Sequence, residues 1–205
     1  MERRNNYAIA AAQARRLFAN YDHLSLARKL GAQMDAQYLY TQMLSCPYRI
    51  HLTTGEIAAL AGQSWRAVEG FNESLTLLDL VCDSREDRCI SGNWKNMSDF
   101  GHQFHQNLLE SADPWASFLQ DHPEKLDAAC RALNAKEYPV KDKAYVIPLF
   151  EDLGVMLKLV YGDDEFPAAV HWFWDENALQ YLKYETMYYA VGMIRDSLNE
   201  KMKVC

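Results

Sequence analysis

Three consecutive acidic residues between two apolar stretches are the most conspicuous candidate for chemistry in the sequence. Asp163, Asp164 and Glu165 lie within the run 162–167. Neighbouring carboxylates repel one another, so a cation, an arginine or backbone N–H groups would stabilise them. One interpretation makes Asp164 and Glu165 metal ligands or an acid–base pair, joined by Asp175 and Glu185 if the last strand and helix fold back. The other interpretation, a solvated turn whose Asp side chains bond their own backbone, is favoured because acidic turns are common.

Two histidines offer a second, weaker candidate site. His102 and His105 are three residues apart, so on a helix they share one face and could both bind a metal ion. No third ligand can be identified from spacing, and Gly101 disfavours a helix there. Packing or surface histidines are therefore the favoured interpretation.

Motifs of common nucleophilic and nucleotide-binding enzymes are absent from the sequence. There is no Gly-x-Ser-x-Gly, no Gly-x-x-x-x-Gly-Lys, no Gly-x-Gly-x-x-Gly and no His-Glu-x-x-His. Cys82 and Cys130 fall on apolar helix stripes and are expected to act as small hydrophobic residues. Cys89, near Arg85 and Arg88, has the best setting for a reactive thiolate, yet an ordinary loop thiol is the favoured interpretation.

Residues 54–65, with the helix predicted after them, imitate a helix-turn-helix. A recognition helix should present basic and amide side chains to the DNA groove. Here the exposed positions supply Arg66 together with Glu69 and Glu73. DNA binding is therefore disfavoured.

Hydrophobic periodicity predicts an α+β fold. The predicted helices cover 7–20, 22–30, 65–82, 103–109, 114–120, 123–133 and 176–202, the last capped by Asp175. The predicted strands cover 38–44, 48–52, 144–150, 155–161 and 169–174, with a hairpin turn at 53–55. Strands cluster toward both ends with helices between them. We expect a single domain over 1–205, with an antiparallel-rich sheet, helices packed on it and a long C-terminal helix.

Composition limits the class of partner. Hydrophobic residues make up 49% and charged residues 24% of the chain, which is typical of a globular protein. The net charge of −7 repels phosphate backbones, so nucleic acid is not expected as a partner. No stretch reads as a signal peptide or membrane span, and five cysteines without a Cys-x-x-Cys pair indicate a reducing, cytoplasmic location. The aromatic surplus leaves a homo-oligomer open.

Six segments carry a resemblance to a known family. They are Leu77-Leu78-Asp79-Leu80, Ser91-Gly92-Asn93-Trp94, Ala129-Cys130-Arg131-Ala132-Leu133, the Gly-Asp-Asp-Glu-Phe-Pro motif at 162–167, Trp174-Asp175-Glu176-Asn177 and Tyr184-Glu185-Thr186. They resemble an uncharacterised bacterial family, common in anaerobes and labelled only as a domain of unknown function. The resemblance implies no activity. Some relatives carry an N-terminal cysteine cluster suited to iron–sulfur binding, but this chain has no cysteine before Cys46, so that cofactor is not carried over.

The residues therefore leave the function unknown, with one preferred hypothesis. It is a cytoplasmic small-molecule or cofactor-binding protein with an acidic and aromatic cleft, whose ligand-binding residues are Trp94, Asp164, Glu165, Asp175 and Glu185. One alternative is a non-enzymatic protein-interaction module. The other is a metal-dependent hydrolase or lyase using Asp164 and Glu165, with His102 and His105 as weak metal candidates. Neither a cofactor nor enzymatic activity can be assigned from the sequence.

Overall fold

The structure is a computed structural model that describes residues 2–101 and 114–204. Its contacts divide the chain into two compact units. Unit 1 contains Met1–Cys89 and Leu179–Met193, and unit 2 contains Ile90–Ala178 and Ile194–Cys205. Each unit holds its own five-stranded sheet, so the two are described separately. The expectation of a single domain stays a prediction.

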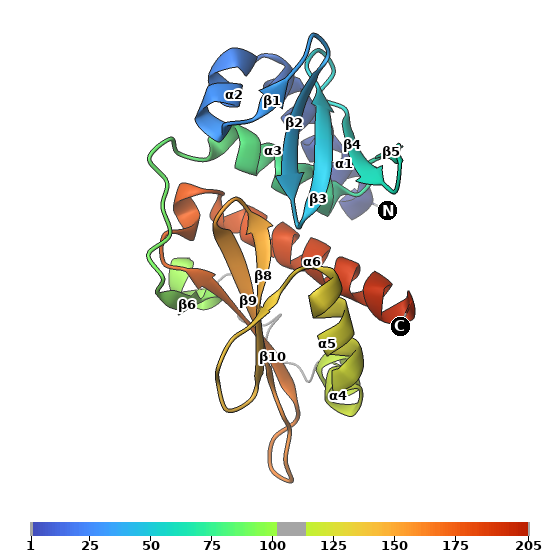
Figure 1. Cartoon of the computed structure of the whole chain (residues 1–205), viewed down its shortest axis with the longest axis vertical. Helices are drawn as coiled ribbons and strands as arrows, with labels where there is room; N and C mark the ends of the chain where they lie inside the picture. Colours follow the sequence, from blue (N-terminus) through green and yellow to red (C-terminus); the bar gives the residue numbers. More distant parts are fainter. Residues whose placement is uncertain (1, 102–113, 205) are drawn as a thin grey trace. The chain divides into compact units, whose positions relative to one another are not determined.

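Unit 1 is a five-stranded antiparallel meander with helices against one face. Its strands follow the order β1-β2-β3-β4-β5 and cover Gln33–Met34, Tyr38–Met43, Cys46–His51, Ile57–Ala61 and Ser64–Ala67 (Figure 1). Its helices are α1 (Glu2–Ala19), α2 (His23–Leu30), α3 (Phe71–Asp83) and the first part of α6 (Tyr184–Val204). A left-handed Gly31 ends α2, as its sequence predicts.

Strand alternation gives the unit 1 sheet one buried face. Its inward side chains are Leu39, Met43, Tyr48, Ile50, Ile57 and Ala59. α3 reaches this face, because the Tyr48 hydroxyl donates a hydrogen bond to Glu73 Oε1 at 2.7 Å. α1 reaches it as well, because the turn at Gly55 packs directly on the α1 backbone at Arg15.

Unit 2 repeats the plan with longer strands. Its sheet has the antiparallel order β6-β10-β9-β8-β7. These strands cover Trp94–Asn96, Ala169–Asp175, Leu153–Val160, Lys143–Phe150 and Lys136–Glu137. The helical segments are Met97–Phe100, α4 (Pro114–Asp121), α5 (Pro123–Ala132), Ala178–Gln180, which extends into unit 1, and the end of α6. α5 is tied to β8 by Asp127, whose carboxylate accepts hydrogen bonds from Lys143 and Tyr145.

The structure confirms the α+β class, the antiparallel sheets and the long C-terminal helix. The strands expected near both ends of the chain form two separate sheets. The hairpin at 53–55 joins β3 to β4, and Ile50 pairs with Ile57 across it. Within the described ranges, no helix has the length and apolarity needed to cross a membrane.

Three predicted helix starts are wrong. The first helix begins at Glu2 rather than at 7. Residues 64–67 form β5, which pairs with β4 through Leu60 and Trp65, so α3 begins only at Phe71. This hairpin also excludes the helix-turn-helix, since both of its arms are strands. The last helix begins at Tyr184 rather than at 176. Asp175 is followed by the short 3-10 segment Ala178–Gln180, and its carboxylate bonds Gly92 as well as Asn177. The predicted helix at 103–109 lies outside the described residues.

Candidate functional site

The acidic run is an exposed turn that bonds its own backbone. Asp163 Oδ1 accepts the N–H groups of Glu165 at 2.9 Å and Phe166 at 2.8 Å. Backbone hydrogen bonds, that of Phe166 first, hold the pKa of Asp163 below its usual value. Asp164 and Glu165 are exposed in the connection between β9 and β10. This geometry matches the solvated-turn interpretation of the run.

Trp94 and Asp175 lie together at the other end of β10. They are paired across β6 and β10, whereas the acidic turn follows the pairing of Val160 with Ala169. The six residue steps from Ala169 to Asp175 span about 20 Å along an extended strand. Within unit 2 the structure therefore does not gather Asp164 and Glu165 with Asp175.

Asp175 organises the loop that precedes β6. Its carboxylate accepts backbone N–H groups from Ser91 at 2.9 Å, Gly92 at 2.7 Å and Asn177 at 2.8 Å. The side chain is buried, and although burial opposes its ionisation, these N–H groups hold its pKa below the usual value. Asp175 thus holds the Ser91-Gly92 segment against the end of β10.

We expect Asp175→Asn to lower the free energy of unfolding by about 1–2 kcal/mol at pH 7. A neutral amide oxygen accepts hydrogen bonds from the backbone N–H groups more weakly than an ionised carboxylate does. Since the native pKa of Asp175 is depressed, its stabilisation is present above the unfolded pKa and lost as pH falls through the native value. Urea denaturation at pH 7 and pH 3 measures both effects. If the free energy of unfolding changes between pH 7 and pH 3 by the same amount in Asp175→Asn as in the wild type, this account is contradicted.

The remaining predicted residues lie elsewhere. Glu185 is exposed on the first turn of α6 in unit 1. His102 and His105 lie outside the described residues. Among the described residues, no group of three His, Cys, Asp or Glu side chains could hold a metal ion. Ligand binding at Trp94, Asp164, Glu165, Asp175 and Glu185 stays a prediction.

Glu185 lines a pocket that sequence reasoning did not find, which we call the acidic cleft. It belongs to unit 1 and has a volume of about 280 Å³. Apolar walls come from α1 and α3, and two tyrosines, Tyr21 and Tyr189, lie at its margin. Its charged lining residues are Asp79, Asp83, Lys183 and Glu185. Convergent charged groups beside apolar walls are typical of small-molecule sites.

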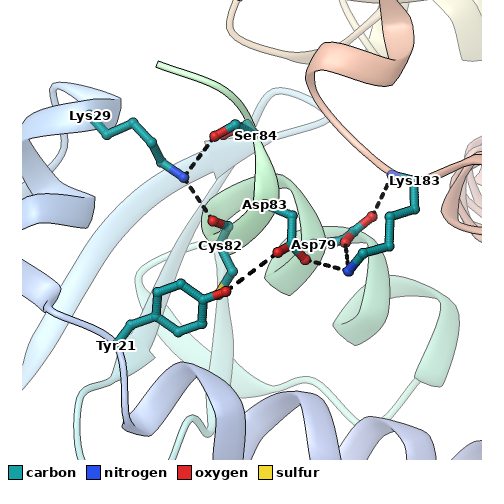
Figure 2. A network of polar contacts seen from close by, with 7 residues as sticks. All are labelled: Tyr21, Lys29, Asp79, Cys82, Asp83, Ser84 and Lys183. Atoms are coloured by element: carbon teal, nitrogen blue, oxygen red, sulfur yellow. Dashed lines mark hydrogen bonds and ion pairs between the residues drawn. The ribbon is translucent and has the colours of Figure 1, made fainter.

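Figure 2 shows the polar network at the charged end of the acidic cleft. Asp79 and Asp83 lie one turn apart on α3, so both carboxylates reach Lys183. The ammonium group of Lys183 donates to Asp79 Oδ1 at 2.9 Å and to Asp83 Oδ2 at 2.5 Å. The Lys183 backbone N–H also donates to Asp79 Oδ2 at 2.8 Å. Tyr21, in the connection between α1 and α2, donates to Asp83 at 3.4 Å.

The two carboxylates are held in different protonation environments. Asp79 is buried and its side chain is 7% exposed, whereas that of Asp83 is 35% exposed. Burial raises the pKa of Asp79 above its usual value, and the adjacent Asp83 raises it further. Burial also opposes ionisation of Asp83, but hydrogen bonds from Asp79 and Lys183 hold its pKa below the usual value. A pair with opposed shifts is an arrangement that acid–base sites use.

Neighbouring groups fix the end of α3 at this network. Lys29 from α2 donates to the carbonyl oxygens of Cys82 and Ser84, both at 2.9 Å (Figure 2). These carbonyls at the helix end lack intrahelical partners, so the ammonium group caps α3. Burial raises the pKa of the Cys82 thiol to about 12, which keeps it protonated at neutral pH. Cys82 is thus a packing residue, as its place on the apolar stripe predicts.

Comparison with known proteins shows the family of the chain. A model of the family described as domain of unknown function (DUF3786) matches residues 22–196, and the chain belongs to this family. The matched range includes Asp79, Asp83 and Lys183 but no residue of α1. No curated protein and no solved structure matches the chain.

Proposed function

We propose that this member of the DUF3786 family binds a small organic cation in the acidic cleft. The supporting observation is a pocket lined by three carboxylates and one ammonium group. Lys183 is engaged by Asp79 and Asp83, whereas Glu185 forms no ion pair among the described residues. The cleft therefore keeps an excess of negative charge beside apolar and tyrosine surface. An amine carried on an apolar or aromatic body complements both features.

The proposal is tested with matched ligands of opposite charge. We expect benzylamine and related aryl amines to give saturable binding by ligand-observed NMR that depends on Asp83. Any binding of benzoate should be the same in the wild type and in Asp83→Asn. Asp83→Asn preserves the shape of the side chain and removes one charge, so it should weaken amine binding by about tenfold.

Glu86→Gln is the matched control, because Glu86 is exposed and does not line the cleft, yet the substitution changes the net charge equally. It should leave amine affinity unchanged. Equal weakening by both variants would reduce the effect to long-range charge and contradict the proposal. Absence of saturable amine binding to the wild type would contradict it outright.

A second candidate function is acid–base catalysis on the bound molecule. The observation that favours it is the opposed pKa shift of Asp79 and Asp83. Amines that bind are incubated with the protein in deuterated water and followed by NMR. Deuterium incorporation at a carbon atom of the amine, seen with the wild type and not with Asp79→Asn, supports catalysis. If no bound amine incorporates deuterium, catalysis is excluded and only the binding function stands.

Location and other partners belong to the same proposal. Cys82 and Cys130 are free thiols, which supports a reducing, cytoplasmic compartment. The net charge of −7 supports the expectation that nucleic acid is not a partner. A bacterial origin and a homo-oligomer stay predictions.

A further inference from the structure

We propose that unit 1 carries another ligand site, on the solvent side of its sheet, for a planar ring that bears an oxyanion. The site is formed around Arg49 on β3 and is separate from the acidic cleft, with which it shares no lining residue. It stands or falls independently of the function proposed for that cleft.

Strand register places a small-residue floor next to Arg49. Arg49 pairs with Ala58 on β4, and Ala58 pairs with Ala67 on β5. Because side chains alternate along a strand, these three residues lie on the face opposite to the buried Tyr48. The two alanines leave the surface hollow beside the guanidinium group.

Two aromatic rings hold the Arg49 guanidinium group. Its central carbon lies 4.4 Å from the centroid of the Tyr38 ring and 4.8 Å from that of Trp65. These contacts fix the orientation of the planar fork but satisfy none of its N–H donors. Within 2–101 and 114–204, no hydrogen bond or ion pair involves this guanidinium group, and its Nε is buried without a partner.

A second guanidinium group, from Arg15 on α1, also has a buried Nε without a hydrogen-bond acceptor in the described part of the chain. Its Nη2 donates to Val68 O at 3.2 Å and to Ser74 Oγ at 3.3 Å, which anchors the side chain. A buried charged donor without an acceptor is unfavourable, and an oxyanion would supply that acceptor.

Both arginines line one pocket of about 480 Å³, together with Tyr38 and Trp65. This volume is ordinary for a small-molecule site. Glu56 and Glu69 lie on the lining but are exposed, and neither forms an ion pair with these arginines in the described structure. Neither glutamate therefore neutralises a guanidinium group by direct contact in the described part of the chain. Guanidinium forks match carboxylate and phosphate geometry, and exposed ring faces favour a flat ligand.

The test uses two ring oxyanions and three controls on the full chain. Intrinsic tryptophan fluorescence, to which Trp65 contributes, is titrated with 2-naphthoate and adenosine monophosphate as probes. 2-Naphthalenemethanol, naphthylmethylamine and inorganic phosphate are the controls. We expect saturable binding of at least one ring oxyanion with a Kd below about 1 mM, and weaker binding of 2-naphthalenemethanol and inorganic phosphate. Naphthylmethylamine is expected in the acidic cleft, so its affinity should not respond to Arg49→Gln. Preference for naphthoate assigns a carboxylate ligand, and preference for the nucleotide assigns a phosphate ester.

Variants assign any binding to this site. Arg49→Gln should weaken the better probe by about tenfold or more, and Arg49→Lys, which keeps the charge but loses the fork, by a similar factor. Arg66→Gln is the matched control, because Arg66 neighbours Trp65 but faces the other side of the sheet, and it should leave affinity unchanged. Urea denaturation verifies that each variant is folded, and Asp83→Asn should not alter naphthoate affinity.

Three results would overturn the site. The first is no saturable binding of either ring oxyanion up to about 10 mM, a concentration at which even millimolar sites fill. The second is equal binding of 2-naphthalenemethanol or of inorganic phosphate, which would remove the need for an oxyanion or for a ring. The third is unchanged affinity in both folded Arg49 variants.

Discussion

Gly55→Ala should lower the free energy of unfolding of unit 1 by about 3 kcal/mol, the largest single-residue effect that we expect. Gly55 has φ +68°, which is costly for a residue with a Cβ atom. An added Cβ would also lie 2.4 Å from the carbonyl oxygen of Arg15, and backbone atoms cannot move aside as a side chain can. Urea denaturation of the variant and wild type measures the loss.

Gly62→Ala separates the two causes of this loss. Gly62 has φ +63° in the next hairpin of the same sheet, but an added Cβ would meet nothing within 4 Å. It should therefore cost only about 1 kcal/mol, the price of the left-handed backbone. If both alanine variants lose the same stability, the close packing of the Gly55 turn on α1 is not a source of stability.

Lys183→Met should destabilise the protein by about 2 kcal/mol at pH 8. The substitution retains the apolar stem of the side chain and removes the ammonium group that Asp79 and Asp83 share. Asp79 then carries a buried charge that only backbone and hydroxyl groups stabilise, and breaking one side of such a pair is costly. The estimate lies below that for a fully buried pair because the Lys183 side chain is 63% exposed.

The pH dependence gives this prediction a sign. Burial raises the native pKa of Asp79, so between the unfolded value of about 3.9 and the native value the folded state binds more protons. Stability from this group therefore falls as pH rises through that interval. Removing the ammonium group raises the native pKa of Asp79 further, so Lys183→Met should cost less at pH 5 than at pH 8.

Asp79→Asn provides the control for that sign. In the Asp79→Asn background, Lys183→Met should lose most of the difference between pH 5 and pH 8, because the titrating buried carboxyl is gone. Urea denaturation of the four proteins at both pH values forms the complete cycle. An equal cost of Lys183→Met at the two pH values in the wild-type background would show that Asp79 does not carry the effect.

Candidate-site residues differed in how far sequence could identify them. Asp79 carried a usable signal, because it interrupts the apolar run of α3 and a lone carboxylate on a buried stripe requires a partner. Its partner Lys183 carried none, since it lies 104 residues away in the chain. Asp164 and Glu165 stood out because acidic residues adjoin one another there. A carboxylate in a turn can, however, accept hydrogen bonds from nearby backbone N–H groups, as Asp163 does from Glu165 and Phe166.

Local periodicity and turn chemistry were enough to predict most elements and the α+β class. The helix end at Gly31, the hairpin at Gly55 and the three long strands of unit 2, β8, β9 and β10, depend on residues close in sequence, so local patterns were enough to predict them. The start of α3 was misjudged because 65–68 carries apolar residues that suit a helix stripe as well as a strand. Pairing of Leu60 with Trp65 resolved that ambiguity.

Only the tertiary structure separated the strands into two sheets, turned Asp175 toward Ser91 and Gly92, and brought Lys183 to α3. The same holds for Arg49, whose setting between Tyr38 and Trp65 depends on the register of four strands. Backbone conformation responds to near neighbours, whereas the burial and charge that give a side chain its chemistry come from residues that chain folding brings alongside it.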